Sequence, residues 1–102
     1  MEQNGIPEKS LELIRKALSK WGEIEKVLIF GSRAMGNYKR GSDVDLCIFG
    51  SKVTEEIVNK LSIELNEMLP LPYYFDAIHY ESLNNEELMT QIDTYGILFY
   101  YK

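Results

Sequence analysis

The stretch Val27–Phe49 reads VLIFGSRAMGNYKRGSDVDLCIF and decides the fold. An apolar run ends abruptly at Gly31-Ser32, a polar loop follows, and a second apolar run opens with two aspartates one residue apart. This order predicts a buried strand, a tight Gly-Ser turn and a second strand that carries paired carboxylates. A short helical turn over residues 31–36 would place the Gly31 and Ser32 amides at its N-terminus, which suits an anionic phosphate.

Alternation along the second strand, predicted from Asp43 to Phe49, determines where its side chains point. Asp43 and Asp45 share one face, while Val44 and its apolar neighbours share the other. The two aspartates have alpha-carbons about 7 Å apart. Their carboxylates can therefore converge on two metal ions about 3.5–4 Å apart, as two-metal phosphoryl and nucleotidyl transfer requires. Cys47 lies deeper on the same face and is predicted to belong to the core.

A third carboxylate, Asp76, lies in the middle of an apolar strand predicted over Tyr73–Tyr80. A helix over about residues 54–69 separates this strand from the preceding one, so the two strands are expected to be parallel neighbours. Asp76 then reaches the same pocket as Asp43 and Asp45. It would act there as a further metal ligand or as the base that accepts the proton of the attacking hydroxyl.

Periodicity and capping signals predict the remaining elements. A first helix is expected over Pro7–Lys20, a helix capped by Thr54 follows the second strand, and a last helix capped by Ser82 is expected over Leu83–Thr94. The final ILFYY is predicted to be a short strand or an extended tail. The buried side of the Thr54 helix is predicted to comprise Ile57, Val58, Leu61, Leu65, Met68 and Leu69.

Length and charge restrict the kind of protein. The 102 residues predict one domain, and 11 basic against 16 acidic residues give a formal net charge of −5. This balance argues against a long nucleic acid as partner.

Three other polar residues have weaker signals. Lys39 and Arg40 form a compact basic pair that is either a solvated loop or a phosphate contact. His79 is interpreted as a partly buried structural residue. Cys47 is the single cysteine, no leader is visible and no apolar run reaches membrane-spanning length, so a cytoplasmic protein is expected.

Three motifs together resemble the nucleotidyltransferases of the DNA polymerase beta superfamily: GSRAMG at 31–36, SDVDL at 42–46, and the later apolar-Asp-apolar strand. Within that superfamily the chain looks like a minimal nucleotidyltransferase (MNT), a small protein that consists of the catalytic palm alone. The resemblance implies an α/β palm over residues 1–102, with a small mixed sheet of about three to four strands packed with helices in αβαβαβα order.

The resemblance also implies roles for seven residues. Asp43, Asp45 and Asp76 would be the catalytic residues and would bind two Mg²⁺ ions, with Mn²⁺ as an alternative ion. The nucleotide would be held by Gly31, Ser32, Arg33 and Ser42.

The implied reaction is transfer of AMP from ATP, or of another nucleoside monophosphate from its triphosphate, to an acceptor hydroxyl. Minimal nucleotidyltransferases are typically paired with a small helical HEPN protein, often an RNase toxin, and act as antitoxins by adenylylating a tyrosine of that toxin. The resemblance therefore implies a protein adenylyltransferase in a hetero-oligomeric toxin–antitoxin pair. A palm alone leaves the nucleotide half exposed, so a second chain is expected to complete the site.

Two other functions are open at the level of sequence. Acceptor specificity lies outside the motifs, so a small-molecule nucleotidyltransferase of the aminoglycoside type has the same residues. A non-catalytic binding module that neutralises its partner by covering it would use the aromatic C-terminal segment instead.

Overall fold

The two apolar runs around the Gly-Ser turn form neighbouring strands in the computed structural model, which describes residues 5–36 and 43–102. The strands are β1 (Lys26–Phe30), β2 (Val44–Phe49), β3 (Phe75–His79) and β4 (Ile97–Tyr101). The α-helices are α1 (Glu8–Ser19), α2 (Ser32–Met35), α3 (Glu55–Ile63) and α4 (Glu86–Tyr95). A π-helical turn, Glu64–Met68, extends α3, and a 3-10 turn, Tyr80–Ser82, follows β3. None of these described helices is long and apolar enough to cross a membrane.

The strands form one mixed sheet in the order β3-β2-β1-β4. Strand β1 is antiparallel to both β2 and β4, whereas β2 and β3 are parallel. A parallel pair needs a long crossover connection, which α3 provides here. The predicted parallel pairing and the predicted α/β fold class are confirmed. The C-terminal ILFYY pairs with β1 as β4, so it is a strand of this sheet and not an extended tail.

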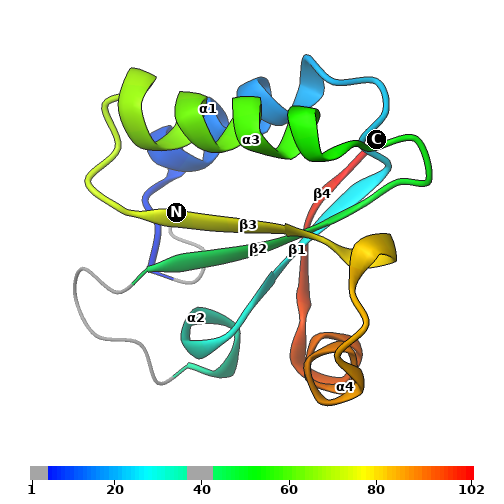
Figure 1. Cartoon of the computed structure of the whole chain (residues 1–102). Coiled ribbons are helices and arrows are strands. Elements are labelled where there is room, and N and C mark those ends of the chain that lie inside the picture. The colour runs from blue at the N-terminus through cyan, green and yellow to red at the C-terminus, as the bar shows by residue number, and fades with distance from the viewer. Residues whose placement is uncertain (1–4, 37–42) are drawn as a thin grey trace.

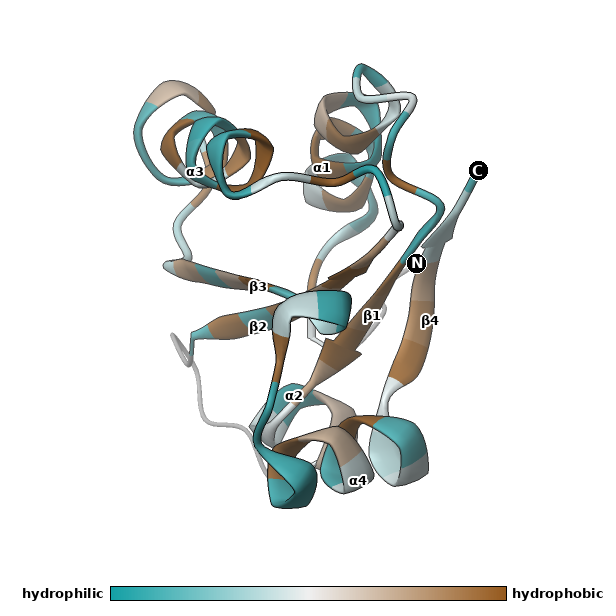
Figure 2. Cartoon of the chain, turned by 45° about the vertical axis from the view of Figure 1, so that its right-hand side comes forward, coloured by the Kyte–Doolittle hydropathy of each residue, from teal (hydrophilic) through white to brown (hydrophobic). Residues whose placement is uncertain are grey.

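Helices α1 and α3 lie on one face of the sheet, and α2 and α4 lie on the other (Figures 1 and 2). The first face holds most of the core, because Val44, Leu46 and Ile48 point into it and are fully buried. On the second face a smaller cluster that includes Cys47 and Ile92 packs around α4. The alternation predicted for the second strand is therefore confirmed.

The helix after Thr54 ends in a π-helical turn that periodicity did not predict. Thr54 caps α3 as expected, because its hydroxyl accepts a hydrogen bond from the Ile57 amide at 3.2 Å. Beyond Ile63 the wider π turn shifts the phase of the helix. Met68, predicted to be buried, is instead 72% exposed, while Leu65 keeps its fully buried place.

The last helix begins later than predicted. Its N-cap is Asn85, whose side chain accepts a hydrogen bond from the Leu88 amide at 3.1 Å. Ser82 instead ends the 3-10 turn, and its hydroxyl lies 2.7 Å from Nδ1 of His79. The predicted start at Leu83 is therefore wrong, because the serine side chain is engaged by the strand that precedes it.

The side chain of Asn66, in the π turn, is hydrogen-bonded to the first residue of β3. Its side-chain oxygen accepts a hydrogen bond from the Phe75 amide at 2.7 Å, and its side-chain amide donates to the Phe75 carbonyl at 3.0 Å. Asn66→Ala removes the partner of both backbone groups of Phe75, which is buried. We therefore expect the free energy of unfolding to fall by about 1–3 kcal/mol in urea denaturation. Asn59→Ala, at an exposed position of α3, should change it by less than about 0.5 kcal/mol. Equal losses in the two variants would contradict the anchoring role.

Candidate active site

Parallel pairing of β2 with β3 brings two of the predicted carboxylates face to face. Asp45 and Asp76 are partners in the register of the two strands, so both side chains lie on the same face of the sheet. This face is opposite the main core, because Val44 and Leu46, which alternate with Asp45, are fully buried on the other side. Asp45 is half-buried and Asp76 is exposed.

The third carboxylate, Asp43, lies immediately before β2 and not within it. Val44, the first residue of the strand, donates its amide to the carbonyl of Tyr74 at 2.8 Å. Asp43 is thereby placed at the end of the paired strands, next to the segment that leads into β3, and its side chain is exposed. The structure therefore brings all three predicted aspartates to one end of the sheet.

The turn after β1 lies against Asp45. Phe30 is the register partner of Asp45, and Gly31, the next residue, is the N-cap of α2 with φ 75° and ψ −151°. Residues other than glycine hardly ever adopt this backbone conformation. A Cβ atom at Gly31 would also collide with Oδ2 of Asp45. The backbone of the Gly-Ser turn and the Asp45 carboxylate are thus close neighbours.

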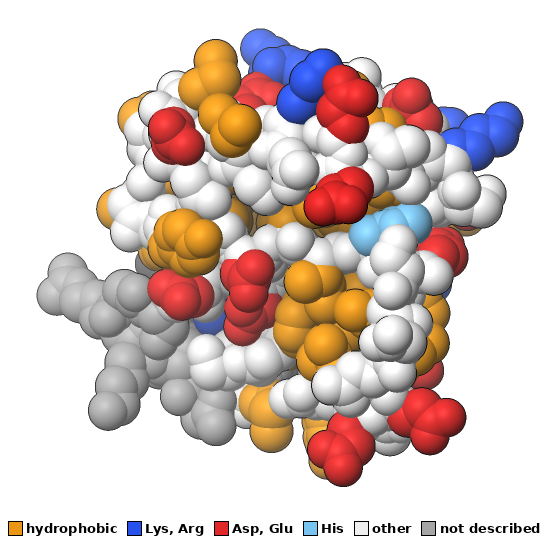
Figure 3. Space-filling model, in the orientation of Figure 1, with side chains coloured by type: hydrophobic (Ala, Val, Ile, Leu, Met, Phe, Trp, Pro, Cys, Tyr) orange, Lys and Arg blue, Asp and Glu red, His pale blue; other side chains and the backbone are white. Residues whose placement is uncertain are grey.

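Asp76 and Asp43 place like charge around the Asp45 carboxylate. Burial raises the pKa of the Asp45 carboxyl above its usual value of 3.8, and the charges of Asp76 and Asp43 raise it further. Figure 3 shows acidic side chains beside an apolar patch on the side of the molecule where β3 forms the edge of the sheet. Nearby negative charges disfavour the ionised form of the Asp45 carboxyl group. The arrangement therefore favours binding of a positive charge.

The residues present fit divalent metal ions in their chemistry. Carboxylate oxygens are the ligands that Mg²⁺ prefers, and the repulsion that raises the pKa of Asp45 is what a cation would remove. Within the described residues, no three acidic, His or Cys side chains converge closely enough, as they stand, to hold an ion. Asp43 and Asp76 are exposed, and Asp45 is half-buried between the strands.

Arg33, predicted to contact the nucleotide, is directed into the protein. The residue is 3% exposed, and its guanidinium carbon lies 5.0 Å from the centroid of the Tyr73 ring. Direct nucleotide contact by Arg33 stays a prediction, and the burial of the side chain argues against it. Ser42, predicted to bind the nucleotide, lies outside the described residues. So do Lys39 and Arg40, for which the sequence left open a solvated loop or a phosphate contact.

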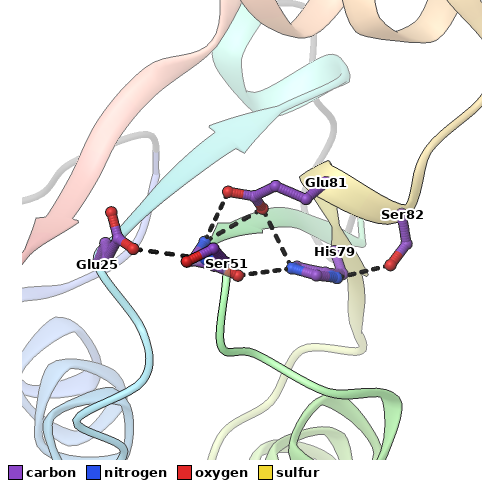
Figure 4. A network of polar contacts seen from close by, with 6 residues as sticks. Glu25, Ser51, His79, Glu81 and Ser82 are labelled. Carbon is purple, nitrogen blue, oxygen red and sulfur yellow. Dashed lines mark hydrogen bonds and ion pairs between the residues drawn. The ribbon is translucent and has the colours of Figure 1, made fainter.

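His79 in β3 and Cys47 in β2 have structural roles. Nε2 of His79 lies 2.8 Å from the Gly50 carbonyl and 3.1 Å from Glu81, and Nδ1 lies 2.7 Å from Ser82 (Figure 4). The Glu81 carboxylate also accepts hydrogen bonds from the Gly50 amide at 3.1 Å. His79 therefore joins the C-terminal ends of β2 and β3, away from the aspartates. Cys47 is fully buried, and burial raises the pKa of its thiol to about 12, so the thiol is unreactive.

Sequence reasoning did not single out Tyr73 or Asn66, which hold the region around the aspartates together. Tyr73 was expected to be the first residue of a strand, and nothing in its local sequence pointed to Arg33. The only local signal for Asn66 was its place next to Leu65, which was predicted to be buried. Buried polar side chains are hydrogen-bonded as a rule, so a bond from this asparagine to a neighbouring element could have been expected.

The sequence matches the family model described as Polymerase beta, Nucleotidyltransferase over residues 12–102. This match spans β1 to β4 and includes the Gly-Ser turn and all three aspartates. The chain therefore belongs to this family of nucleotidyltransferases. No curated protein matches the sequence at a significant level.

Several solved structures share the fold of this chain. A chain of a toxin–antitoxin complex with AMP-PNP is 21% identical with a TM-score of 0.74, covering 90% of this chain and 73% of that one. A chain of the MntA–HepT toxin–antitoxin complex is 17% identical with a TM-score of 0.70, covering 94% and 74%. A chain of the complex between the tri-AMPylated Shewanella oneidensis HEPN toxin and its MNT antitoxin is 18% identical with a TM-score of 0.69, covering 92% and 71%. The resemblance to minimal nucleotidyltransferases predicted from the motifs is confirmed at the level of the fold.

The close approach of Gly31 to Asp45 predicts the effect of a single methyl group. Gly31→Ala forces alanine into a glycine-only conformation and pushes its Cβ into the Asp45 carboxylate. We expect the free energy of unfolding to fall by about 1–3 kcal/mol from the backbone strain alone, as measured by chemical denaturation. Gly22→Ala is the matched control, since a Cβ there meets no atom within 4 Å. A Gly31→Ala protein as stable as Gly22→Ala would contradict the described turn.

The raised pKa of Asp45 predicts how stability depends on pH. A carboxyl group whose pKa is higher in the folded than in the unfolded state reduces stability as pH rises through and above that interval, and has no effect below its unfolded pKa. In metal-free buffer, Asp45→Asn should therefore melt at a higher temperature than the wild type at about pH 7, and the difference should vanish at about pH 3. Glu12→Gln removes an exposed carboxylate from α1 as a control. The same gain in that control would assign the effect to net charge and not to the three aspartates.

Proposed function

We propose that this chain transfers AMP from ATP to a hydroxyl group of a partner protein, and that the acceptor is a tyrosine of a helical HEPN toxin. The observation that carries the proposal is the register of β2 and β3, which sets Asp45 opposite Asp76 beside the Gly31 turn. The chain's membership of the nucleotidyltransferase family supports the type of reaction. The partner is inferred from the toxin–antitoxin complexes in which chains of the same fold occur.

The phosphates of the nucleotide would bind at the turn after β1. The Gly31 and Ser32 amides precede or open α2, and Gly31 has no side chain to keep a ligand away from the backbone. Backbone N–H groups in such a position favour an anion. Ser42 would add a hydroxyl contact, as the family pattern implies.

The three aspartates would hold the divalent ions, with Mg²⁺ as the expected species and Mn²⁺ as its substitute. When bound, these ions would neutralise charge on the phosphates and orient the acceptor hydroxyl. Asp45 is the central ligand of the proposed set, because both other carboxylates act on its pKa. Asp76, the exposed member on β3, is placed to complete the ligand set or to take the proton from the acceptor hydroxyl.

The experiment that tests the proposal combines the purified chain with radiolabelled ATP, Mg²⁺ and its helical partner protein. Label is expected on the partner, with pyrophosphate released. Asp43→Ala and Asp76→Ala should each reduce labelling by about 10²-fold or more, the scale of losing one preorganised charged group. Glu12→Ala, on the opposite side of the sheet, should label at the wild-type rate.

Three other outcomes would redirect the proposal. Label on a small hydroxylated compound, with none on the partner, would favour the small-molecule transferase. Full neutralisation of the toxin by Asp43→Ala at physiological levels would show that binding is sufficient. No label under Mg²⁺ or Mn²⁺ on any acceptor would overturn the enzymatic function.

A further inference from the structure

Among the described residues, Arg33 is the one charged side chain that is buried. It follows Gly31 and Ser32 directly, so it lies within the short helix that begins at the proposed phosphate site. A guanidinium group taken out of water costs free energy unless partners compensate it. Its burial beside the turn therefore indicates a function in holding the turn.

The guanidinium of Arg33 stacks on the ring of Tyr73. The 5.0 Å from Cζ to the ring centroid is within the range of about 6 Å for a cation–π contact. Tyr73 lies two residues before β3, far from Arg33 in the sequence. The contact thus connects the helix after β1 with the segment that leads to Asp76.

Tyr73 is itself fixed to β3. Its ring meets the ring of Phe75 edge-on, with centroids 6.2 Å apart and an interplanar angle of 82°. Phe75 is 1% exposed, and both its backbone groups are bonded to Asn66. A continuous set of contacts therefore runs from α2 through Arg33 and Tyr73 to the strand that carries Asp76.

Helix α2 is too short to fix its own orientation. It spans four residues, its N-cap makes no side-chain hydrogen bond, and both flanking glycines, Gly31 and Gly36, have positive φ. A helix this short has almost no stability of its own. A contact from its second residue, Arg33, to the ring of Tyr73 is a direct way to hold it.

We propose that Arg33 is a positioning residue, which sets the Gly31–Ser32 turn relative to Asp76 by stacking on Tyr73 and does not touch the nucleotide. The inference rests on the proposed nucleotidyltransferase function and names what aligns the two halves of that site. A misplacement of about 1 Å between reacting groups can reduce a rate about 10²-fold. Loss of the alignment between the Gly31–Ser32 turn and Asp76 should therefore be measurable in the kinetics.

A double-mutant cycle separates positioning from direct contact. The variants are Arg33→Met, Tyr73→Leu and the pair together, assayed in the full chain with its partner protein. If Arg33 acts through the ring, each single change should raise the KM for ATP about 10-fold and weaken binding of AMP-PNP similarly, and the double variant should be no worse than either. Tyr73→Phe keeps the ring and should stay within about twofold of the wild type.

A second pair in the same chain serves as the matched control. Arg15 on α1 stacks over Phe99 with its Cζ 5.3 Å from the ring centroid, on elements remote from the aspartates. Arg15→Met should lower the melting temperature without altering the KM for ATP. Arg33→Lys keeps the charge and loses the planar group, so it provides a milder variant if Arg33→Met does not fold.

The exchange rate of the Met35 amide, which donates to the Gly31 carbonyl at 3.1 Å, gives a readout that needs no nucleotide. Arg33→Met and Tyr73→Leu should speed its hydrogen exchange equally, and Arg15→Met should not. A wild-type chain that binds no ATP would defeat the proposed function, while this exchange result would still decide the positioning role. An unchanged exchange rate and KM in Tyr73→Leu, with KM raised in Arg33→Met, would identify Arg33 as a direct ligand and overturn the inference.

Discussion

The parallel register of β2 and β3 is the constraint on which the site depends. It sets Asp45 opposite Asp76, and a shift by one residue would turn one carboxylate into the apolar core. The register is fixed on both sides of the carboxylates: Asn66 holds Phe75 at the start of β3, and the His79 network holds the far ends of both strands. Like charges that repel are thus kept together by hydrogen bonds and apolar packing elsewhere in the sheet.

The candidate site consists of two parts of the chain with different chemical properties, the turn after β1 and the strand pair β2 and β3. The turn after β1 supplies backbone groups and almost no side-chain bulk, whereas β2 and β3 supply charge. The two parts meet where Gly31 approaches Asp45, and the Arg33–Tyr73 contact spans them a second time. A chain with this division needs only a small sheet to form the charged half of the proposed nucleotide site.

Local patterns predicted the element order, the parallel pair and the grouping of three aspartates, because alternation and crossover rules act over short distances in the chain. They did not predict what depends on longer-range contacts. Met68 was assigned to the core because helical periodicity assumes an unbroken α-helix, and the π turn changes the phase. Arg33 was assigned to the nucleotide from its place in a motif, and only the folded chain shows the ring of Tyr73 beneath it.

The position of β4 has a consequence for biosynthesis. Strand β1 is paired on both sides, with β2 soon after it in the chain and with β4 about seventy residues later. While the intervening residues are being translated, one side of an almost wholly apolar strand has no neighbour, and open strand edges invite wrong partners. The nascent chain is therefore most vulnerable between the completion of β2 and the arrival of β4, an interval in which a chaperone or a co-translated partner would have its greatest effect.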